Sequence, residues 1–137
     1  MNTCKDMDRK KYYKYLFLSG AIWNLSVGFI FMLITIFAYN FGISLFDMTP
    51  PASKVFIQGF LVLVFTIGIG LLAVSFKPEQ YYWIVTMFAF EKYAITIVVF
   101  AHYFMEEYNF LFVAMILVDL AYGILFTEFL IRNRDRK

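Results

Sequence analysis

The sequence predicts an all-α membrane protein, a bundle of four transmembrane helices that run up, down, up and down, with both termini in the cytoplasm. Three observations predict it: an apolar composition, four long apolar runs, and an uneven distribution of basic residues. Hydrophobic residues make up 62% of the 137-residue chain and charged residues 16%, where soluble domains carry about 45–50% and about 25%. A soluble fold of this length could not bury so much apolar surface, so lipid must solvate much of it. We expect one domain, residues 1–137.

The apolar runs are long enough to cross a bilayer. Each has about 23–24 residues, and at about 1.5 Å per residue such a helix crosses a hydrocarbon core of about 30 Å with some tilt. Backbone polar groups in lipid must be satisfied within the segment, which requires helices at this length. The runs cover residues 15–38, 54–76, 81–104 and 108–131.

Polar residues and prolines separate the runs. The first break contains Asp47 and the Pro50-Pro51 pair, and Ser53 is placed to cap the second helix. The second break is the short polar turn 77–79, and the third contains the acidic pair 106–107. Short connections favour antiparallel neighbours, and therefore an up-down-up-down bundle.

The basic residues predict the orientation. Of the 12 Lys and Arg residues, ten lie in the N-terminal arm, the second turn and the C-terminal tail, whereas the first loop has only Lys54, at its boundary with the second run. Basic residues accumulate on the cytoplasmic side, which predicts a multi-pass protein of the cytoplasmic (inner) membrane with both termini inside. Because the basic clusters adjoin apolar runs, they indicate topology and contact with membrane lipid rather than nucleic-acid binding.

Polar side chains recur at the same depth in all four predicted helices. Measured from the cytoplasmic ends at about 1.5 Å per residue, Asn24 and Thr66 lie about 14–15 Å deep, Glu91 and Lys92 about 15–17 Å, and Asp119 about 18 Å. A charge at this depth costs roughly 2.5–3.5 kcal/mol, so it requires a partner. These five residues predict a polar layer near the midplane of the membrane.

Lys92 and Asp119 are the natural ion pair within this layer, because they lie at similar depth on helices that are adjacent and antiparallel. We expect nitrogen and oxygen within roughly 4 Å of each other. Glu91 lies about 100° from Lys92 around its helix, so it is either protonated or shares the ammonium group from one side. Tyr122 shares a helical face with Asp119 and completes the candidate site.

Recognised chemical motifs are otherwise absent from the sequence. There is no cluster of His, Cys and carboxylates at metal-ligand spacing, no glycine-rich phosphate loop and no Ser–His–acid set. Cys4 is the only cysteine, which excludes an internal disulfide. We therefore expect no catalytic residues, no metal and no cofactor.

Several segments resemble a known group of proteins. They are GAIWNLSVGF (20–29), FGI (41–43), QGFLVLVFTIGIG (58–70), KP (77–78), Lys92 and DLAYGILF (119–126). Together they resemble a widespread group of small bacterial four-helix membrane proteins that is loosely DoxX-like. In that group's pattern, Asn24, Gly59, Pro78, Lys92 and Asp119 would occupy recurring positions, whereas Glu91 lies outside it.

The resemblance implies a membrane function without a defined activity. DoxX-like proteins are associated with quinone-linked oxidoreductases, and the bundle is also similar to sterol-isomerase-type EXPERA proteins, which bind lipophilic ligands between helices. The leading hypothesis is a non-catalytic protein that binds a quinone, isoprenoid or lipid, or that serves as an accessory subunit of a membrane complex. The alternatives are a dimeric proton-coupled transporter and a lipid-modifying isomerase.

Overall fold

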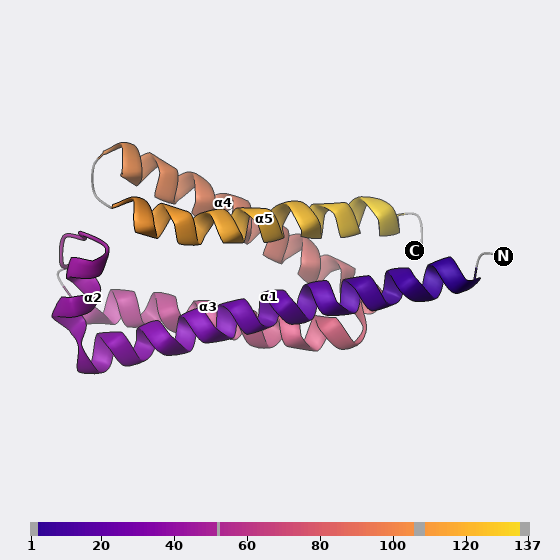
Figure 1. The fold of residues 1–137 in the computed structure, drawn as a ribbon, viewed down its shortest axis with the longest axis horizontal. Coiled ribbons are helices and arrows are strands. Elements are labelled where there is room, and N and C mark those ends of the chain that lie inside the picture. The colour runs from indigo at the N-terminus through magenta and orange to yellow at the C-terminus, as the bar shows by residue number, and fades with distance from the viewer. Residues whose placement is uncertain (1–2, 52, 106–108, 135–137) are drawn as a thin grey trace.

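The protein is an all-α bundle with four helices long and apolar enough to cross a membrane (Figure 1). The computed structural model describes residues 3–51, 53–105 and 109–134. Both ends of the chain lie at the same end of the bundle, as an up-down-up-down arrangement requires. The elements are α1 (Thr3–Phe37), α2 (Tyr39–Leu45), α3 (Lys54–Phe76), the 3₁₀ helix η1 (Pro78–Tyr81), α4 (Tyr82–Phe104) and α5 (Phe110–Asn133).

The predicted spans agree with the observed helices except at the start of the first. α3 has the predicted bounds, and α4 and α5 begin and end within two residues of prediction. α1 instead begins twelve residues before residue 15, at Thr3. No Gly or Pro stands between Thr3 and Ser19, so the basic arm can continue the helix without a break.

The connections follow the predicted capping chemistry where the structure describes them. The Ser53 hydroxyl accepts a hydrogen bond from the backbone N–H of Val55 at 3.3 Å and thereby caps α3. The predicted turn at 77–79 is the start of η1, with Pro78 in its first turn. The predicted acidic turn 106–107 lies outside the described residues.

Helix α2 was not predicted from the sequence. The helical path breaks at Ala38, and α2 folds back so closely that a Cβ atom on Gly42 would lie 2.8 Å from Cγ2 of Ile34 in α1. After α2, Asp47 adopts a φ of 55°, a left-handed conformation that Asp tolerates better than most residues. The α2 segment therefore covers the end of the bundle opposite the termini (Figure 1).

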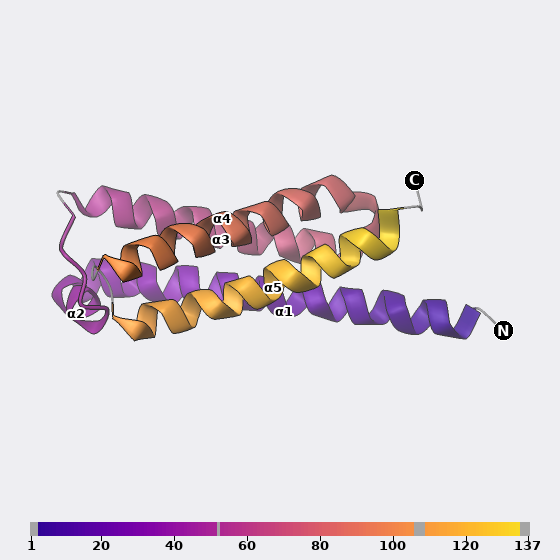
Figure 2. The ribbon, with the colours of Figure 1, turned by 90° about the horizontal axis from the view of Figure 1, so that it is seen from above.

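The four long helices form two tight pairs. α1 packs along α3, and α4 packs along α5, whereas contacts between the pairs are sparse. Figure 1 shows the pairs close together near the termini and spread apart toward α2, and Figure 2, seen from above, shows α4 and α5 lying over α3 and α1.

The hydrophobic core follows this divergence. At the terminal end, one cluster unites all four helices, and Phe17, Leu71, Val85 and Phe126 are fully buried in it. Toward α2, the second cluster is built by α4 and α5 alone, from Val99, Val113 and Ile116. The bundle is thus solidly packed in one half and open between the pairs in the other.

Large apolar side chains cover the outside of the helices. They are exposed on every long helix, and include Phe29, Leu63, Phe90, Ile97 and Ile131. Exposed apolar surface on this scale needs lipid as its solvent. The chain is therefore a multi-pass membrane protein.

Candidate functional site

The predicted ion pair forms where the two helix pairs begin to diverge. Lys92 Nζ on α4 lies 3.0 Å from Asp119 Oδ1 on α5, which confirms the predicted pairing. The Lys92 side chain is 1% exposed and that of Asp119 is 16% exposed. A lysine this deeply buried needs its ammonium hydrogens satisfied by nearby acceptors.

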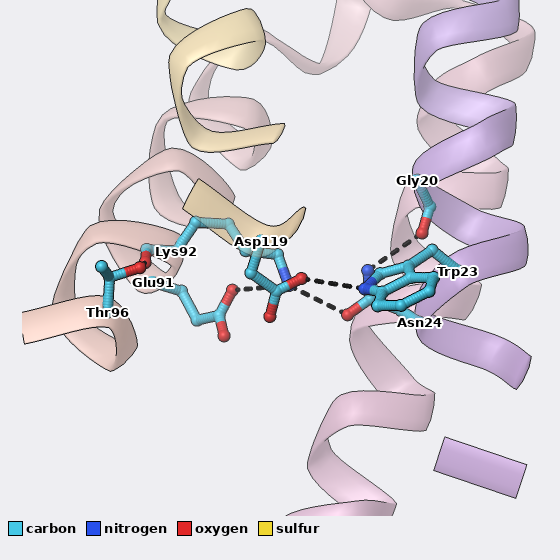
Figure 3. Close-up of polar contacts among 7 residues, drawn as sticks. All are labelled: Gly20, Trp23, Asn24, Glu91, Lys92, Thr96 and Asp119. Carbon is cyan, nitrogen blue, oxygen red and sulfur yellow. Dashed lines mark hydrogen bonds and ion pairs between the residues drawn. The ribbon is translucent and has the colours of Figure 1, made fainter. Parts of the chain in front are cut away.

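Two residues of α1 connect this ion pair to the other helix pair. Lys92 Nζ donates to Asn24 Oδ1 at 3.0 Å, and the Trp23 indole N–H donates to Asp119 Oδ1 at 3.2 Å. The Asn24 amide nitrogen donates in turn to the backbone oxygen of Gly20 at 2.9 Å, which fixes the orientation of the amide. Figure 3 shows these contacts converging between α1 on one side and α4 and α5 on the other.

Glu91 approaches the same ammonium group from the side. Its Oε2 lies 3.5 Å from Lys92 Nζ, within ion-pair distance but without hydrogen-bond geometry to a described residue. The side chain is 30% exposed, much more than that of Lys92. Of the two predicted possibilities, the geometry matches sharing of the ammonium from one side.

Local packing fixes the position of Lys92. Gly123 on α5 faces its stem, and a Cβ atom on that glycine would lie 3.2 Å from Cβ of Lys92. One turn further along α4, the Thr96 hydroxyl donates to the backbone oxygen of Lys92 at 2.7 Å. A second polar contact, between the Tyr93 and Thr127 hydroxyls at 3.0 Å, holds α4 against α5 nearby. The close contact of α4 and α5 thus directs the lysine toward α1.

A cavity of about 360 Å³ lies beside the polar cluster, between the diverging helix pairs. Trp23, Asn24 and Asp119 form its polar end, and α2 with Phe46 lies at the opposite end. The volume falls within the roughly 300–1,000 Å³ typical of small-molecule sites. Its walls between these ends are largely aliphatic and aromatic, including Val27, Phe31, Phe60, Val64, Ile95, Val99, Phe112 and Ile116.

The exposed lining residues indicate where the cavity opens. Phe56, Phe60 and Val98 are the exposed side chains among the lining residues, and all three belong to α3 or α4. These two helices make few contacts with each other. The cavity therefore opens sideways between α3 and α4, toward the surface that faces lipid.

Two of the predicted site residues lie outside the polar cluster. Thr66 is exposed, and its hydroxyl donates to the backbone oxygen of Val62 at 2.8 Å. A threonine that bonds its own helix has no need of a partner across the bundle. The face of α3 that packs inward instead carries Leu61, Gly68 and Leu71. The prediction for Thr66 was therefore wrong.

Tyr122 lies next to the cluster, in the apolar core. Its ring lies over Gly20, at 3.4 Å from where a Cβ atom would be, and 5.9 Å from the Phe126 ring. It does not line the cavity. The structure thus brings together Asn24, Glu91, Lys92 and Asp119 of the six predicted site residues.

Trp23 is the member of the site that the sequence analysis missed. The sequence did contain one signal. Tryptophan prefers the membrane interface, but Trp23 adjoins Asn24, which is predicted to lie at the midplane. A tryptophan at that depth needs an acceptor for its indole N–H, and Asp119 provides it. The cavity itself depends on how the helix pairs diverge, which no local sequence pattern encodes.

Comparison of the chain with protein families, curated proteins and solved structures gives no match.

Proposed function

We propose that this protein binds a lipophilic small molecule, a quinone, isoprenoid or lipid, in the cavity between its two helix pairs. One observation carries the proposal: an apolar cavity of about 360 Å³ ends on three polar side chains, Trp23, Asn24 and Asp119. Such a combination suits an amphiphile, because the walls remove an apolar chain from water and the polar end orients its head group.

The lateral opening supports entry from the membrane. A molecule dissolved in lipid would reach the cavity between Phe60 of α3 and Val98 of α4 without crossing water. The resemblance to DoxX-like and EXPERA-like proteins agrees with this proposal but does not carry it. The protein would act on its own as a carrier or sensor, or as an accessory subunit that presents the ligand to a larger complex.

Two matched valines of α3 allow a direct test. Val64 lines the cavity, whereas Val62 does not and is 55% exposed. The wild type, Val64→Trp and Val62→Trp are purified in lipid nanodiscs and extracted with organic solvent, and the extracts are compared by mass spectrometry. We expect one lipophilic species to be enriched with the wild type and Val62→Trp and lost from Val64→Trp. Equal extracts from all three proteins would overturn the proposal.

A dimeric proton-coupled transporter is the second candidate, and Glu91 favours it. Its Oε2 is buried without hydrogen-bond geometry to a described residue, next to the ammonium of Lys92. Carboxylates placed in this way inside membranes recur in proton-coupled transport. Four helices are too few for a pathway in one protomer, so this function requires a dimer. A protein that remains monomeric in nanodiscs by mass photometry would exclude it.

A further inference from the structure

The polar end of the cavity offers acceptors rather than donors. Trp23 donates its indole N–H to Asp119, and Asn24 donates one amide N–H to the backbone oxygen of Gly20 and accepts from Lys92 through Oδ1. Both contacts to Asp119 end on Oδ1. Its other carboxylate oxygen has no hydrogen bond in the described part of the chain, and Figure 3 shows it directed away from the two donors.

Asp119 is also more accessible than Asn24 at this polar end. Its side chain is 16% exposed and lines the cavity, whereas Asn24 is only 2% exposed. A carboxylate accepts hydrogen bonds and cannot donate them when ionised. The free oxygen of Asp119 is therefore the group that a bound head group would meet.

The one cation of the cluster is withdrawn from the cavity. Lys92 does not line it, and three oxygens surround its ammonium group, from Asn24 at 3.0 Å, Asp119 at 3.0 Å and Glu91 at 3.5 Å. An ammonium group has three N–H donors, and because Lys92 does not line the cavity, none of them is offered to a ligand there. The cluster combines one formal positive charge with the two carboxylates of Glu91 and Asp119, which disfavours an anionic head group.

Elsewhere in the cavity, polar groups are few and lie away from this end. The Thr35 hydroxyl donates to the backbone oxygen of Met32 at 2.9 Å. Tyr39 lies at the α2 end, with Lys54 Nζ 4.4 Å from its ring centroid. Neither residue supplies a donor beside Asp119.

We infer that the cavity selects amphiphiles whose head group, such as an alcohol or an ammonium group, donates a hydrogen bond to Asp119. Carboxylates, phosphates and heads that only accept, such as ethers and quinone carbonyls, are discriminated against. This inference rests on the proposed function and narrows it, since it favours a long-chain or isoprenoid alcohol, a quinol or an amine over a quinone.

The two tryptophans of the chain make the experiment possible. Trp23 lines the cavity, whereas Trp83 is 70% exposed on α4 and lies outside it. In a Trp83→Phe protein held in nanodiscs whose scaffold protein lacks tryptophan, the tryptophan emission therefore reports on the cavity alone. The probes are four molecules with the same chain, 1-dodecanol, dodecylammonium, dodecyl methyl ether and laurate, each titrated into the protein in nanodiscs.

We expect the alcohol and the ammonium to bind about tenfold more tightly than the ether, the equivalent of one hydrogen bond to a charged group. Laurate should bind more weakly than the alcohol. Comparison of alcohol with ammonium identifies which donor is preferred. Equal affinity for alcohol and ether, or tighter binding of laurate, would overturn the inference while the cavity still binds lipophiles. Failure of all four probes to change the Trp23 emission would instead overturn the proposed function.

A variant without the acceptor provides the second measurement. In Trp83→Phe with Lys92→Met and Asp119→Leu, the polar end keeps Trp23 and Asn24 but loses the carboxylate acceptor, without an unpaired lysine. We expect this protein to bind the alcohol and the ether with equal affinity. A preference for the alcohol that survives in this variant would show that Asp119 is not the acceptor and would overturn the inference. Because the probe series in the parent protein is decisive by itself, the test does not depend on the stability of this variant.

Discussion

Trp23 on α1 donates its indole N–H to Asp119 on α5, and this hydrogen bond joins the two helix pairs where they begin to diverge. Asn24 makes a parallel connection from α1 to Lys92 on α4. Contacts between the pairs are otherwise sparse, so these two bonds fix how the pairs meet at that depth. Trp23, Asn24 and Asp119 also form the polar end of the cavity. The same polar groups therefore determine the geometry of the bundle and the chemistry of the site.

The ion pair itself gives the first prediction. Lys92→Met and Asp119→Leu should each destabilise the protein by about 3–5 kcal/mol, because each leaves a buried charge without its partner. The double variant should be more stable than either single variant, since both charges and their desolvation cost are removed together. Thermal unfolding in detergent of the wild type, both singles and the double measures the coupling. Additive losses would contradict the contact seen between Nζ and Oδ1.

A second prediction contrasts two polar residues that the sequence placed at the same depth. Asn24→Leu removes an acceptor from Lys92 and should cost about 1–3 kcal/mol, the range for leaving a buried donor unsatisfied. Thr66→Val should leave stability nearly unchanged, because its exposed hydroxyl bonds only its own helix. Thermal unfolding of both variants in the same detergent provides the comparison. A loss at Thr66 as large as that at Asn24 would place the threonine inside the bundle after all.

These two residues also illustrate how far the sequence could predict the site. Depth along a helix follows from counting residues, and it correctly paired Lys92 with Asp119 because a buried charge has few alternatives to a charged partner. Depth says nothing about rotation around the helix axis. The Thr66 hydroxyl bonds the backbone of its own helix, so the residue can face either the lipid or the bundle interior. The charge of Lys92 needs a partner on another helix, so Lys92 has to face the interior.

The fold could be predicted further than the site. The four spans follow from the length of the apolar runs, because lipid requires helices there. α2 could not be predicted in this way, since seven residues are too few for a hydropathy signal, and its position depends on Gly42 packing against α1. The cavity depends on how the two helix pairs diverge, and the contacts that join the pairs, Trp23 to Asp119 and Asn24 to Lys92, link residues far apart in the sequence.

The contact between α1 and α3 gives a third prediction. A Cβ atom on Gly68 would lie 2.9 Å from the backbone nitrogen of Leu25, whereas one on Gly59 of the same helix would meet nothing within 4 Å. Gly68→Ala should therefore destabilise the protein by about 1–3 kcal/mol through overpacking. Gly59→Ala is the matched control and should cause no loss. Thermal unfolding of the two variants checks this, and equal stability would mean that α1 and α3 do not approach so closely.

The orientation in the membrane is the fourth prediction. The asymmetry of basic residues predicts that a reporter fused after Lys137 is cytoplasmic. A reporter inserted at the exposed Thr49, close to Phe46, should be on the opposite side. Paired reporters, one active only in the cytoplasm and one active only outside it, distinguish the two sides at each position. A C-terminus outside the cytoplasm would reverse the orientation while leaving the bundle itself unchanged.

The last prediction concerns the segment that closes the cavity. The Asn109 side chain donates to the backbone oxygen of Leu45 at 2.8 Å, and its backbone N–H donates to the oxygen of Phe46 at 3.0 Å. The Phe46 side chain is 5% exposed and packs against the rings of Phe31 and Phe112. Asn109 thus ties the end of α2 to the beginning of α5, over the α2 end of the cavity.

Removing the side-chain hydrogen bond from Asn109 to Leu45 should loosen α2 without unfolding the bundle. We expect Asn109→Ala to cost about 1 kcal/mol, the typical net value of one hydrogen bond, and to speed hydrogen exchange at the amides of residues 39–48. Ser44→Ala is the control, because the exposed Ser44 hydroxyl donates only to the oxygen of Phe41 within the same segment. Hydrogen exchange of the two variants and the wild type is measured in nanodiscs by mass spectrometry, and the rates are compared. If the amides of residues 39–48 exchange no faster in Asn109→Ala than in Ser44→Ala, then the ring contacts of Phe46 hold the segment and the side chain of Asn109 does not.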